Sequence, residues 1–236
     1  MTFIERLNKI FYKKLQNNWD DKIFRQILLS KINSNSICLD LAAGAGIVTE
    51  MNFKSQCKEM HGIDLDERII ENTFLDYPVV GNCENLPYRD CTFDIIFCDN
   101  LFEHLENPKK IFIEVSRVLK PGGKFLFKTP NRFHYMPLIS YLTPHSFHQW
   151  YNKIRGREIE DTFQTFYRAN SVGDIRSLAK NLPLKINKIY LIEGRPEYLK
   201  INSFLYLLGI FYERIVNFSS LLKTFRILLI GELEKK

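Results

Sequence analysis

The sequence is poor in the features that mark small secreted domains and metal-binding domains. Its 236 residues include five cysteines, an odd number, and no Cys-x-x-Cys pair. This spacing indicates neither a disulfide framework nor a zinc cluster, and it favours a reducing, cytoplasmic environment. Residues 1–18 lack the continuous apolar core of a signal peptide, and their apolar residues recur at helical spacing instead. The sequence also contains no internal repeat and no low-complexity tract.

The composition is that of an ordinary globular protein, with 45% hydrophobic and 25% charged residues. The length suits one α/β domain with a substantial core and is short for two. The formal net charge is +6, but the lysines are scattered over both ends of the chain, which favours a solvated surface over a nucleic-acid site. We therefore expect a single domain over residues 1–236, beginning with a helical segment at residues 1–30.

Short apolar segments alternate with helical patterns through the middle of the chain. Four nearly continuous apolar segments are expected to be buried parallel strands, at residues 36–41, 59–64, 93–98 and 124–129. Three helices are expected between them, at residues 46–53, 67–75 and 108–119. The last of these begins with Asn107 and Pro108 and is expected to stop at Pro121-Gly122-Gly123. This order predicts an α/β fold with a parallel sheet, helices on both faces and right-handed crossovers.

The alternation stops after Thr129. Residues 131–170 are rich in aromatic side chains, and so long an interruption predicts a lid over the substrate. The later elements expected are a helix and two strands, at residues 171–181, 185–192 and 225–233. Between these strands, residues 199–222 form an apolar insertion whose helix, 203–216, is too short to span a bilayer. We expect this helix to be buried, with a cover over the active site, a dimer contact and a membrane-surface contact as alternatives.

The segment from Cys38 to Gly46 joins the first expected strand to a loop of small residues. In a parallel α/β sheet such a loop lies at the carboxyl ends of the strands, where ligands bind. Gly44 and Gly46 allow the backbone to approach a ligand closely. Asp64 ends the second strand, and its carboxylate can accept hydrogen bonds from two ribose hydroxyls. Together these features predict an adenosine cofactor.

The loop does not fit a dinucleotide cofactor. The fingerprint G-x-G-x-x-G, started at Gly44, requires glycine where the sequence has Thr49. Asp40, directly before the loop, would repel a phosphate, whereas it could orient a cationic amino-acid group. A sulfonium cofactor that carries an amino acid and no phosphate fits these charges better.

Five motifs follow one another along the chain: Asp40-x-Ala42-x-Gly44-x-Gly46, Gly62-Ile63-Asp64-Leu65-Asp66, Asn82-Cys83-Glu84-Asn85-Leu86-Pro87-Tyr88, Phe93-Asp94-Ile95-Ile96 and Arg117-Val118-Leu119-Lys120-Pro121-Gly122-Gly123. Their order and spacing resemble those of the class I S-adenosylmethionine-dependent methyltransferases of type 11. The resemblance implies a Rossmann-like, mostly parallel sheet of seven strands whose last hairpin is reversed. Two positions depart from the family pattern: Ala42 replaces the usual first glycine, and Asn82 stands where aspartate is commoner.

The resemblance also implies that S-adenosylmethionine is the cofactor. Asp40 and the loop would surround its methionine part, Asp64 would hold the ribose, and residues 82–84 would lie along the adenine. The predicted cofactor-binding residues are Asp40, Ala42, Gly44, Gly46, Asp64, Leu65, Asn82, Cys83, Glu84 and Asn100.

Methyl transfer is an in-line displacement that depends on alignment, and an oxygen nucleophile also benefits from a general base. His104 is the best-placed base, since it follows the fourth strand, although it could instead pack under the next helix. His134, His145 and His148 are alternative bases. Leu101-Phe102-Glu103-His104 resembles part of the Glu-x-x-Glu-His signature of quinone O-methyltransferases. Asn100 occupies the first acid position of that signature, so no metal is expected.

Acceptor binding is expected from the aromatic-rich insertion, whose predicted binding residues are Arg132, His134, Tyr135, His145, His148 and Trp150. We expect O-methylation of a small molecule, a glycan or a lipid-linked acceptor, without nucleic acid, in the cytoplasm or at the inner membrane face. The alternatives are a nucleic-acid methyltransferase, a non-catalytic cofactor-binding module and, more remotely, a nicotinamide oxidoreductase. Asp99-Asn100-Leu101-Phe102 stands where adenine-modifying enzymes have Asn-Pro-Pro-aromatic, which disfavours the first alternative. The sequence leaves the oligomeric state open.

Overall fold

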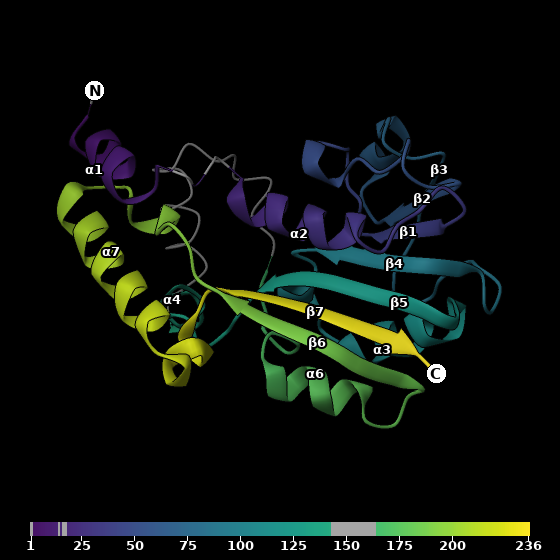
Figure 1. Cartoon of the computed structure of the whole chain (residues 1–236). Coiled ribbons are helices and arrows are strands. Elements are labelled where there is room, and N and C mark those ends of the chain that lie inside the picture. Colours follow the sequence, from purple (N-terminus) through teal and green to yellow (C-terminus); the bar gives the residue numbers. More distant parts are fainter. Residues whose placement is uncertain (1, 14, 16–17, 143–163) are drawn as a thin grey trace.

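The computed structural model describes residues 2–13, 15, 18–142 and 164–236, which form a central sheet with helices on both faces (Figure 1). The strands in the described residues are β1 Ile37–Leu41, β2 Glu59–Asp64, β3 Tyr77–Val80, β4 Phe93–Asp99, β5 Leu119–Pro130, β6 Leu184–Ile192 and β7 Leu228–Lys235. They form one seven-stranded sheet in the order β3-β2-β1-β4-β5-β7-β6. Neighbouring strands are parallel except at β7, which is antiparallel to both β5 and β6. The α/β fold with a mostly parallel sheet and a reversed last hairpin is thus confirmed.

Helices lie on both faces of the sheet, with α2 on one face and α3 and α6 on the other (Figure 1). The α-helices in the described residues are α1 Phe3–Phe11, α2 Trp19–Leu29, α3 Pro108–Val118, α4 Tyr135–Leu142, α6 Val172–Ala179 and α7 Ser203–Phe218. The 3-10 helices there are η1 Thr49–Met51, η2 Glu67–Glu71, η3 Phe102–His104, η5 Glu197–Leu199 and η6 Ser220–Phe225. Because alternate strand residues point to opposite faces, Phe125 and Phe127 of β5 pack toward α3 and α6, whereas Leu126 packs toward α2. None of the helices in the described residues has the length and apolarity needed to cross a bilayer.

Two of the expected helices are wrong. Residues 46–53 contain only η1, and residues 67–75 contain only η2. In the second segment, Asn72 binds backbone instead of continuing a helix: its Nδ2 donates to the carbonyls of Ala43 and Gly44, and its Oδ1 accepts from the N–H of Phe74. Side-chain bonds of this kind compete with helical hydrogen bonds. They also tie the segment to the loop after β1.

Several element boundaries differ from the sequence-based prediction, and no range was predicted for β3. β3 contains Pro78, which an edge strand tolerates because it needs no donor on its open side. The expected helical segment at residues 1–30 holds two helices, α1 and α2. β5 begins at Leu119, before the Pro-Gly-Gly turn, because Leu119 already pairs with Phe93 of β4. Of the expected lid, residues 143–163 lie outside the described residues.

The expectation that the helix at 203–216 is buried holds for one face of α7 only. Tyr206, Ile210 and Val216 are at most 5% exposed, whereas Phe204 is 69% and Phe211 is 65% exposed. The helix extends to Phe218, and η6 follows it before β7 begins at Leu228.

Gly231 of β7 lies opposite Phe127 of β5, and a Cβ atom at position 231 would overlap the Phe127 ring, which is fully buried. We expect Gly231→Ala to lower the free energy of unfolding by about 1–3 kcal/mol, because the packed ring has no space to move into. Urea unfolding measures the change.

Gly173→Ala in α6 is the matched control, because the nearest atom to a new Cβ there is Ser171 Oγ at 3.7 Å. This variant is expected to be neutral or slightly stabilising, since alanine favours a helix. A Gly231→Ala protein as stable as Gly173→Ala would show that the close packing of Gly231 against Phe127 is not needed.

Candidate functional site

The loop at residues 42–46 follows β1 in the middle of the sheet, where the strand order reverses between β2 and β4. Ligands of open α/β sheets bind at this position. Ala42, Gly44 and Gly46 all have positive φ, at 60°, 53° and 74°. Ala42 thus has a conformation that suits the glycine more common at this position in the family it resembles. The loop turns sharply and presents its backbone at the carboxyl end of β1.

Asp64, at the end of β2, binds this loop directly. Its Oδ2 accepts a hydrogen bond from the N–H of Gly44 at 2.8 Å, and its Oδ1 accepts one from the N–H of Asp66 at 2.9 Å. Each carboxylate oxygen has a second lone pair. The carboxylate therefore lies beside the loop, and its ribose contact stays a prediction.

A cavity of about 310 Å³, called here the smaller cavity, opens between the loop and the end of β4. The predicted residues that line it are Asp40, Ala42, Gly44, Gly46 and Asn100. Sequence reasoning missed Met51, Asn72, Phe74 and Leu75, which also line it. These four come from segments predicted as regular helices, so no sequence pattern marked them as facing a ligand.

Acidic side chains lie at the base of the smaller cavity. Asp40 is 7% exposed, and burial raises its pKa well above the usual range. The charged side chains that raise this pKa further are Asp99 and Asp64, both of them acids. Ionised carboxylates grouped in this way repel one another, so a cationic ligand group would stabilise their charged forms.

The other predicted cofactor residues do not line the smaller cavity. Leu65 is 71% exposed, Asn82 accepts a hydrogen bond from the N–H of Glu84, and the Glu84 carboxylate pairs with Lys110 at 2.9 Å. Cys83 is buried near the loop, and burial raises the pKa of its thiol to about 12. The adenine contact predicted for residues 82–84 stays a prediction.

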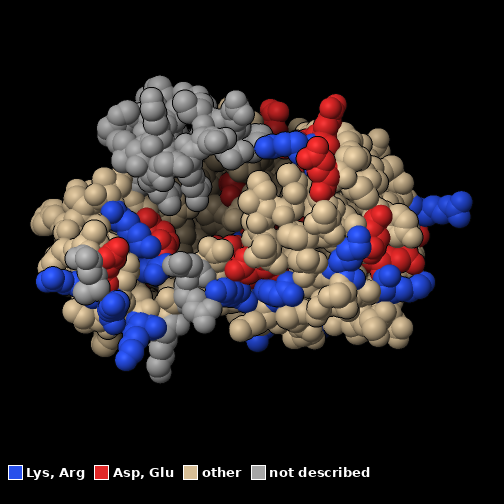
Figure 2. Space-filling view, turned by 90° about the horizontal axis from the view of Figure 1, so that it is seen from above, with Lys and Arg blue, Asp and Glu red and all other residues tan. Residues whose placement is uncertain are grey.

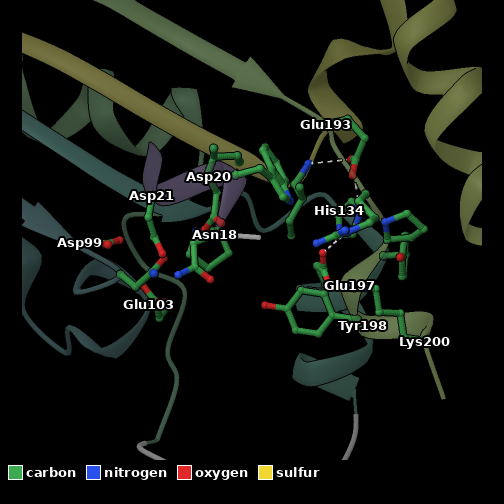
Figure 3. A pocket seen from close by; sticks show the side chains of 18 of the residues that line it. Asn18, Asp20, Asp21, Asp99, Glu103, His134, Glu193, Glu197, Tyr198 and Lys200 are labelled. Carbon is green, nitrogen blue, oxygen red and sulfur yellow. Dashed lines mark hydrogen bonds and ion pairs between the residues drawn. The ribbon is translucent and has the colours of Figure 1, made fainter. Parts of the chain in front are cut away.

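A second cavity, of about 690 Å³ and called here the larger cavity, adjoins the first one. Val48, Asp99 and Asn100 line both of them. Its walls come from the start of α2, the end of β4 with η3, the start of α4 and residues 193–200 (Figure 3). Acidic side chains lie around the hollow seen in Figure 2. The acids that line the cavity are Asp20, Asp21, Asp99, Glu103, Glu193 and Glu197.

Three of these acids, Asp20, Asp21 and Asp99, form an acidic wall around a buried lysine, Lys128. Lys128 Nζ lies 2.9 Å from Asp99 Oδ1 and 3.1 Å from Asp20 Oδ2, and it also contacts Asp21. Burial alone would lower the pKa of Lys128, but the three carboxylates outweigh burial and raise it. Burial raises the pKa of Asp99 to about 7 although Lys128 opposes the shift. One ammonium therefore faces three carboxylates, and the wall keeps an excess of negative charge.

His104, the predicted base, lines the larger cavity. Its Nδ1 lies 2.9 Å from the carbonyl oxygen of Gln164, so Nδ1 carries the proton and Nε2 the lone pair. Burial lowers the pKa of His104, which favours this neutral form. Glu103, beside it, accepts a hydrogen bond from Thr129 Oγ1, and burial raises its pKa to about 7. Two candidate bases, His104 and Glu103, thus line the same cavity, and sequence reasoning singled out only the first.

Two predicted acceptor residues, His134 and Tyr135, also line the larger cavity. His134 Nδ1 accepts a hydrogen bond from the N–H of Met136, and its Nε2 lies 3.5 Å from Glu193 Oε2 (Figure 3). Burial lowers the pKa of His134 to about 3 and raises that of Glu193 to about 8, so the pair is neutral at pH 7.

The remaining predicted acceptor residues are not brought to the larger cavity. Arg132 pairs with Asp174 of α6 at 3.3 Å, because it precedes α4 on the side of the sheet that α6 covers. His145, His148 and Trp150 lie outside the described residues. Within the described ranges, no group of three or more His, Cys, Asp or Glu side chains is arranged to hold a metal ion.

Comparison with known proteins identifies related sequences. The family model for the methyltransferase domain matches residues 39–127. A probable S-adenosylmethionine-dependent methyltransferase of Mycolicibacterium smegmatis is 32% identical over 103 residues, 42% of this chain and 40% of that protein. YcgJ of Bacillus subtilis, an uncharacterized methyltransferase, is 31% identical over 143 residues, 54% of each chain. A ubiquinone biosynthesis O-methyltransferase of Hydrogenovibrio crunogenus is 27% identical over 143 residues, 51% of this chain and 59% of that protein.

The crystal structure of YcgJ has the same fold, with a TM-score of 0.56 at 18% identity over 91% of this chain and 98% of that one. In sequence, the chain spans about half the length of the three relatives. The matched region includes the loop after β1 and the end of β4, which line the smaller cavity, and Asp64, which binds the loop but does not line that cavity. Residues 39–127 match the methyltransferase domain family, and the relatives and the fold support a class I S-adenosylmethionine-dependent methyltransferase.

Proposed function

We propose that the chain transfers a methyl group from S-adenosylmethionine, bound at the loop after β1, to an acceptor in the larger cavity. The observation that carries this proposal is the wall common to the two cavities, formed by Val48, Asp99 and Asn100. Because the same residues line both cavities, the cavities adjoin. A methyl donor in one and an acceptor in the other would lie a short distance apart, as in-line displacement requires.

The residues around the smaller cavity fit S-adenosylmethionine, the cofactor of this family. When bound, the cofactor supplies an electrophilic methyl group and leaves as a neutral thioether. Its ammonium and sulfonium groups are cations, and Asp40, Asp64 and Asp99 provide the negative field that would stabilise them. Asp64 has acceptor lone pairs for the ribose hydroxyls. The loop, with three positive-φ residues, allows the close approach of its backbone.

The acceptor atom in this proposal is oxygen, on a small molecule, a glycan or a lipid-linked molecule. A hydroxyl nucleophile must lose a proton, and two candidate bases line the larger cavity: the neutral His104 imidazole and Glu103, whose pKa burial raises to about 7. The relative from Hydrogenovibrio crunogenus is an O-methyltransferase by name, which agrees with oxygen as the acceptor. The acidic wall disfavours a nucleic acid, whose phosphates it would repel.

Calorimetric titration with S-adenosylmethionine, S-adenosylhomocysteine and NADH tests the cofactor. We expect the two sulfur compounds to bind and NADH not to bind, because Asp40 and Asp64 repel a pyrophosphate. Asp64→Asn is expected to weaken S-adenosylhomocysteine binding by about 10–100-fold, since hydrogen bonds to a charged group contribute about 1.5–3 kcal/mol each.

The matched control is Asp66→Asn, two residues away, whose carboxylate binds Arg68 on the surface. It should leave the affinity within a few-fold of wild type. Equal affinity in Asp64→Asn and Asp66→Asn would remove Asp64 from the ribose contact, and binding of NADH alone would favour the oxidoreductase.

Cofactor binding should depend on pH through Asp40. A cationic ligand binds the ionised carboxylate best, so affinity for S-adenosylmethionine rises as pH increases through the raised pKa of Asp40. Binding at pH 6 should therefore release protons to the buffer, measurable by calorimetry in buffers of different ionisation enthalpy. Asp40→Asn should release fewer protons; unchanged release would assign the effect to Asp99, whose pKa is also raised.

Turnover is tested by transfer of a labelled methyl group to phenols, catechols and glycans. With an acceptor found, we expect His104→Gln to lower kcat by about 10²–10⁴-fold while the dissociation constant of S-adenosylhomocysteine changes little. Glu103→Gln is the companion variant. The general base is the residue whose substitution abolishes the fall in rate at low pH. If neither loss slows turnover, alignment alone suffices. A folded protein that binds the cofactor and methylates none of these acceptors would support the non-catalytic module.

A further inference from the structure

The face of α7 that points away from the sheet consists of large apolar side chains. Phe204, Phe211 and Phe218 are 69%, 65% and 92% exposed. Leu207, Leu208 and Ile215 are 41–48% exposed. Their spacing of three or four residues places them on one side of the helix. We call this set of six residues the outward apolar face.

The orientation of α7 is determined by polar contacts on its other side. The Tyr206 hydroxyl binds Asn8 Oδ1 of α1, and the Tyr12 hydroxyl donates to Glu213 Oε2 at 3.1 Å. Tyr206 and Ile210 pack with Leu7 and Tyr12 in a small apolar cluster. In Figure 1, α1 and α7 lie together at the margin of the molecule. Rotating α7 to bury the outward apolar face would break these contacts and would expose the carboxylate of Glu213.

The exposed charged residues of α7 and η6 are cations. Within residues 203–225, which are all described, the exposed charged residues are Arg214 and Lys223. The single acid of that range, Glu213, is buried and also accepts from Asn217 Nδ2 at 2.7 Å. Next to α7, α1 and its end contribute three exposed cations, Arg6, Lys9 and Lys13, and one exposed acid, Glu5, which accepts a hydrogen bond from the N–H of Thr2. An apolar helical face bordered by cations is the pattern of helices that lie in the interface of an anionic membrane.

We propose that the outward apolar face, with Arg214 and Lys223, docks the protein onto the surface of an anionic lipid bilayer. α7 has 16 residues, which at 1.5 Å per residue reach about 24 Å, less than the hydrocarbon core of a bilayer. The helix therefore lies along the interface, with its phenylalanines among the acyl chains and its cations at the lipid phosphates. This proposal does not depend on the proposed methyl transfer.

Charge complementarity favours lipid over a second copy of the chain as the occupant. A two-fold dimer through the same face brings each copy's Arg214 and Lys223 toward those of its partner. No exposed acid of residues 203–225 is available to pair with them. Arg214 already has Glu213 Oε2 at 3.4 Å on its inner side. Lipid phosphates supply negative charge on the outer side, and each lysine or arginine close to such a surface adds to the binding.

Co-sedimentation with vesicles of phosphatidylcholine, with and without phosphatidylglycerol, tests the proposal. We expect binding to the phosphatidylglycerol vesicles that weakens with added salt. The variant Phe204→Ser/Phe211→Ser/Phe218→Ser should bind at least about tenfold more weakly, because its apolar insertion is lost. Ile113→Ser on α3, where the isoleucine is 44% exposed, should bind like wild type. Thermal unfolding verifies that each variant is folded.

The contribution of charge is tested by Arg214→Glu/Lys223→Glu, expected to lower binding to anionic vesicles by about tenfold or more. Lys109→Glu/Lys180→Glu changes the net charge equally at two exposed lysines away from α7, and should change binding much less. Equal loss in the two charge variants, or serine variants that bind like wild type, would overturn the proposal. So would a dimer in sedimentation equilibrium that the serine substitutions dissociate, since the face would then bind a second copy.

Discussion

One buried ammonium group determines where the elements around the candidate site can lie. Lys128 belongs to the otherwise apolar segment of β5, and its side chain is fully buried. A buried charge without partners is strongly destabilising, and removing one partner of such a pair costs about 3–5 kcal/mol. The partners come from two other elements: Asp99 ends β4, and Asp20 and Asp21 begin α2. The start of α2 must therefore lie over the carboxyl end of β5.

This constraint shapes both cavities. Because α2 also packs on the sheet through Phe24 and Leu28, its N-terminal turn becomes a wall of the larger cavity. Three carboxylates surround one ammonium, so the group keeps an excess of negative charge. Asp99 belongs to this group and also raises the pKa of Asp40 in the smaller cavity by electrostatic repulsion. The two cavities thus share one electrostatic environment, which suits a cationic donor on one side and a neutral acceptor that must lose a proton on the other.

The sequence predicted what depends on local pattern. The apolar segments of β1, β2, β4 and β5, the small-residue loop and Asp64 are short-range features, and the structure places them as expected. The expected helix after β2 failed because Asn72 binds the backbone of a loop 28–29 residues away. Lys128 could be recognised as an anomaly in an apolar strand, but its partners Asp20 and Asp21 are 107–108 residues away along the chain. The larger cavity combines α2 with residues 193–200, and no spacing in the sequence relates such distant segments.

The helix α7 shows why hydrophobicity alone does not identify what covers a residue. Its sequence is apolar on nearly every side, a pattern that in a globular protein is typical of a buried helix. Core and lipid both accept apolar side chains, so the pattern cannot separate them. The polar side chains determine the orientation of α7. Tyr206 and Glu213 bind Asn8 of α1 and Tyr12 directly after it, so the opposite side of α7 faces outward. The segment that leads into α7 carries Glu197, Tyr198 and Lys200 into the wall of the larger cavity. The orientation of α7 at a bilayer would therefore also set the direction from which an acceptor reaches that cavity.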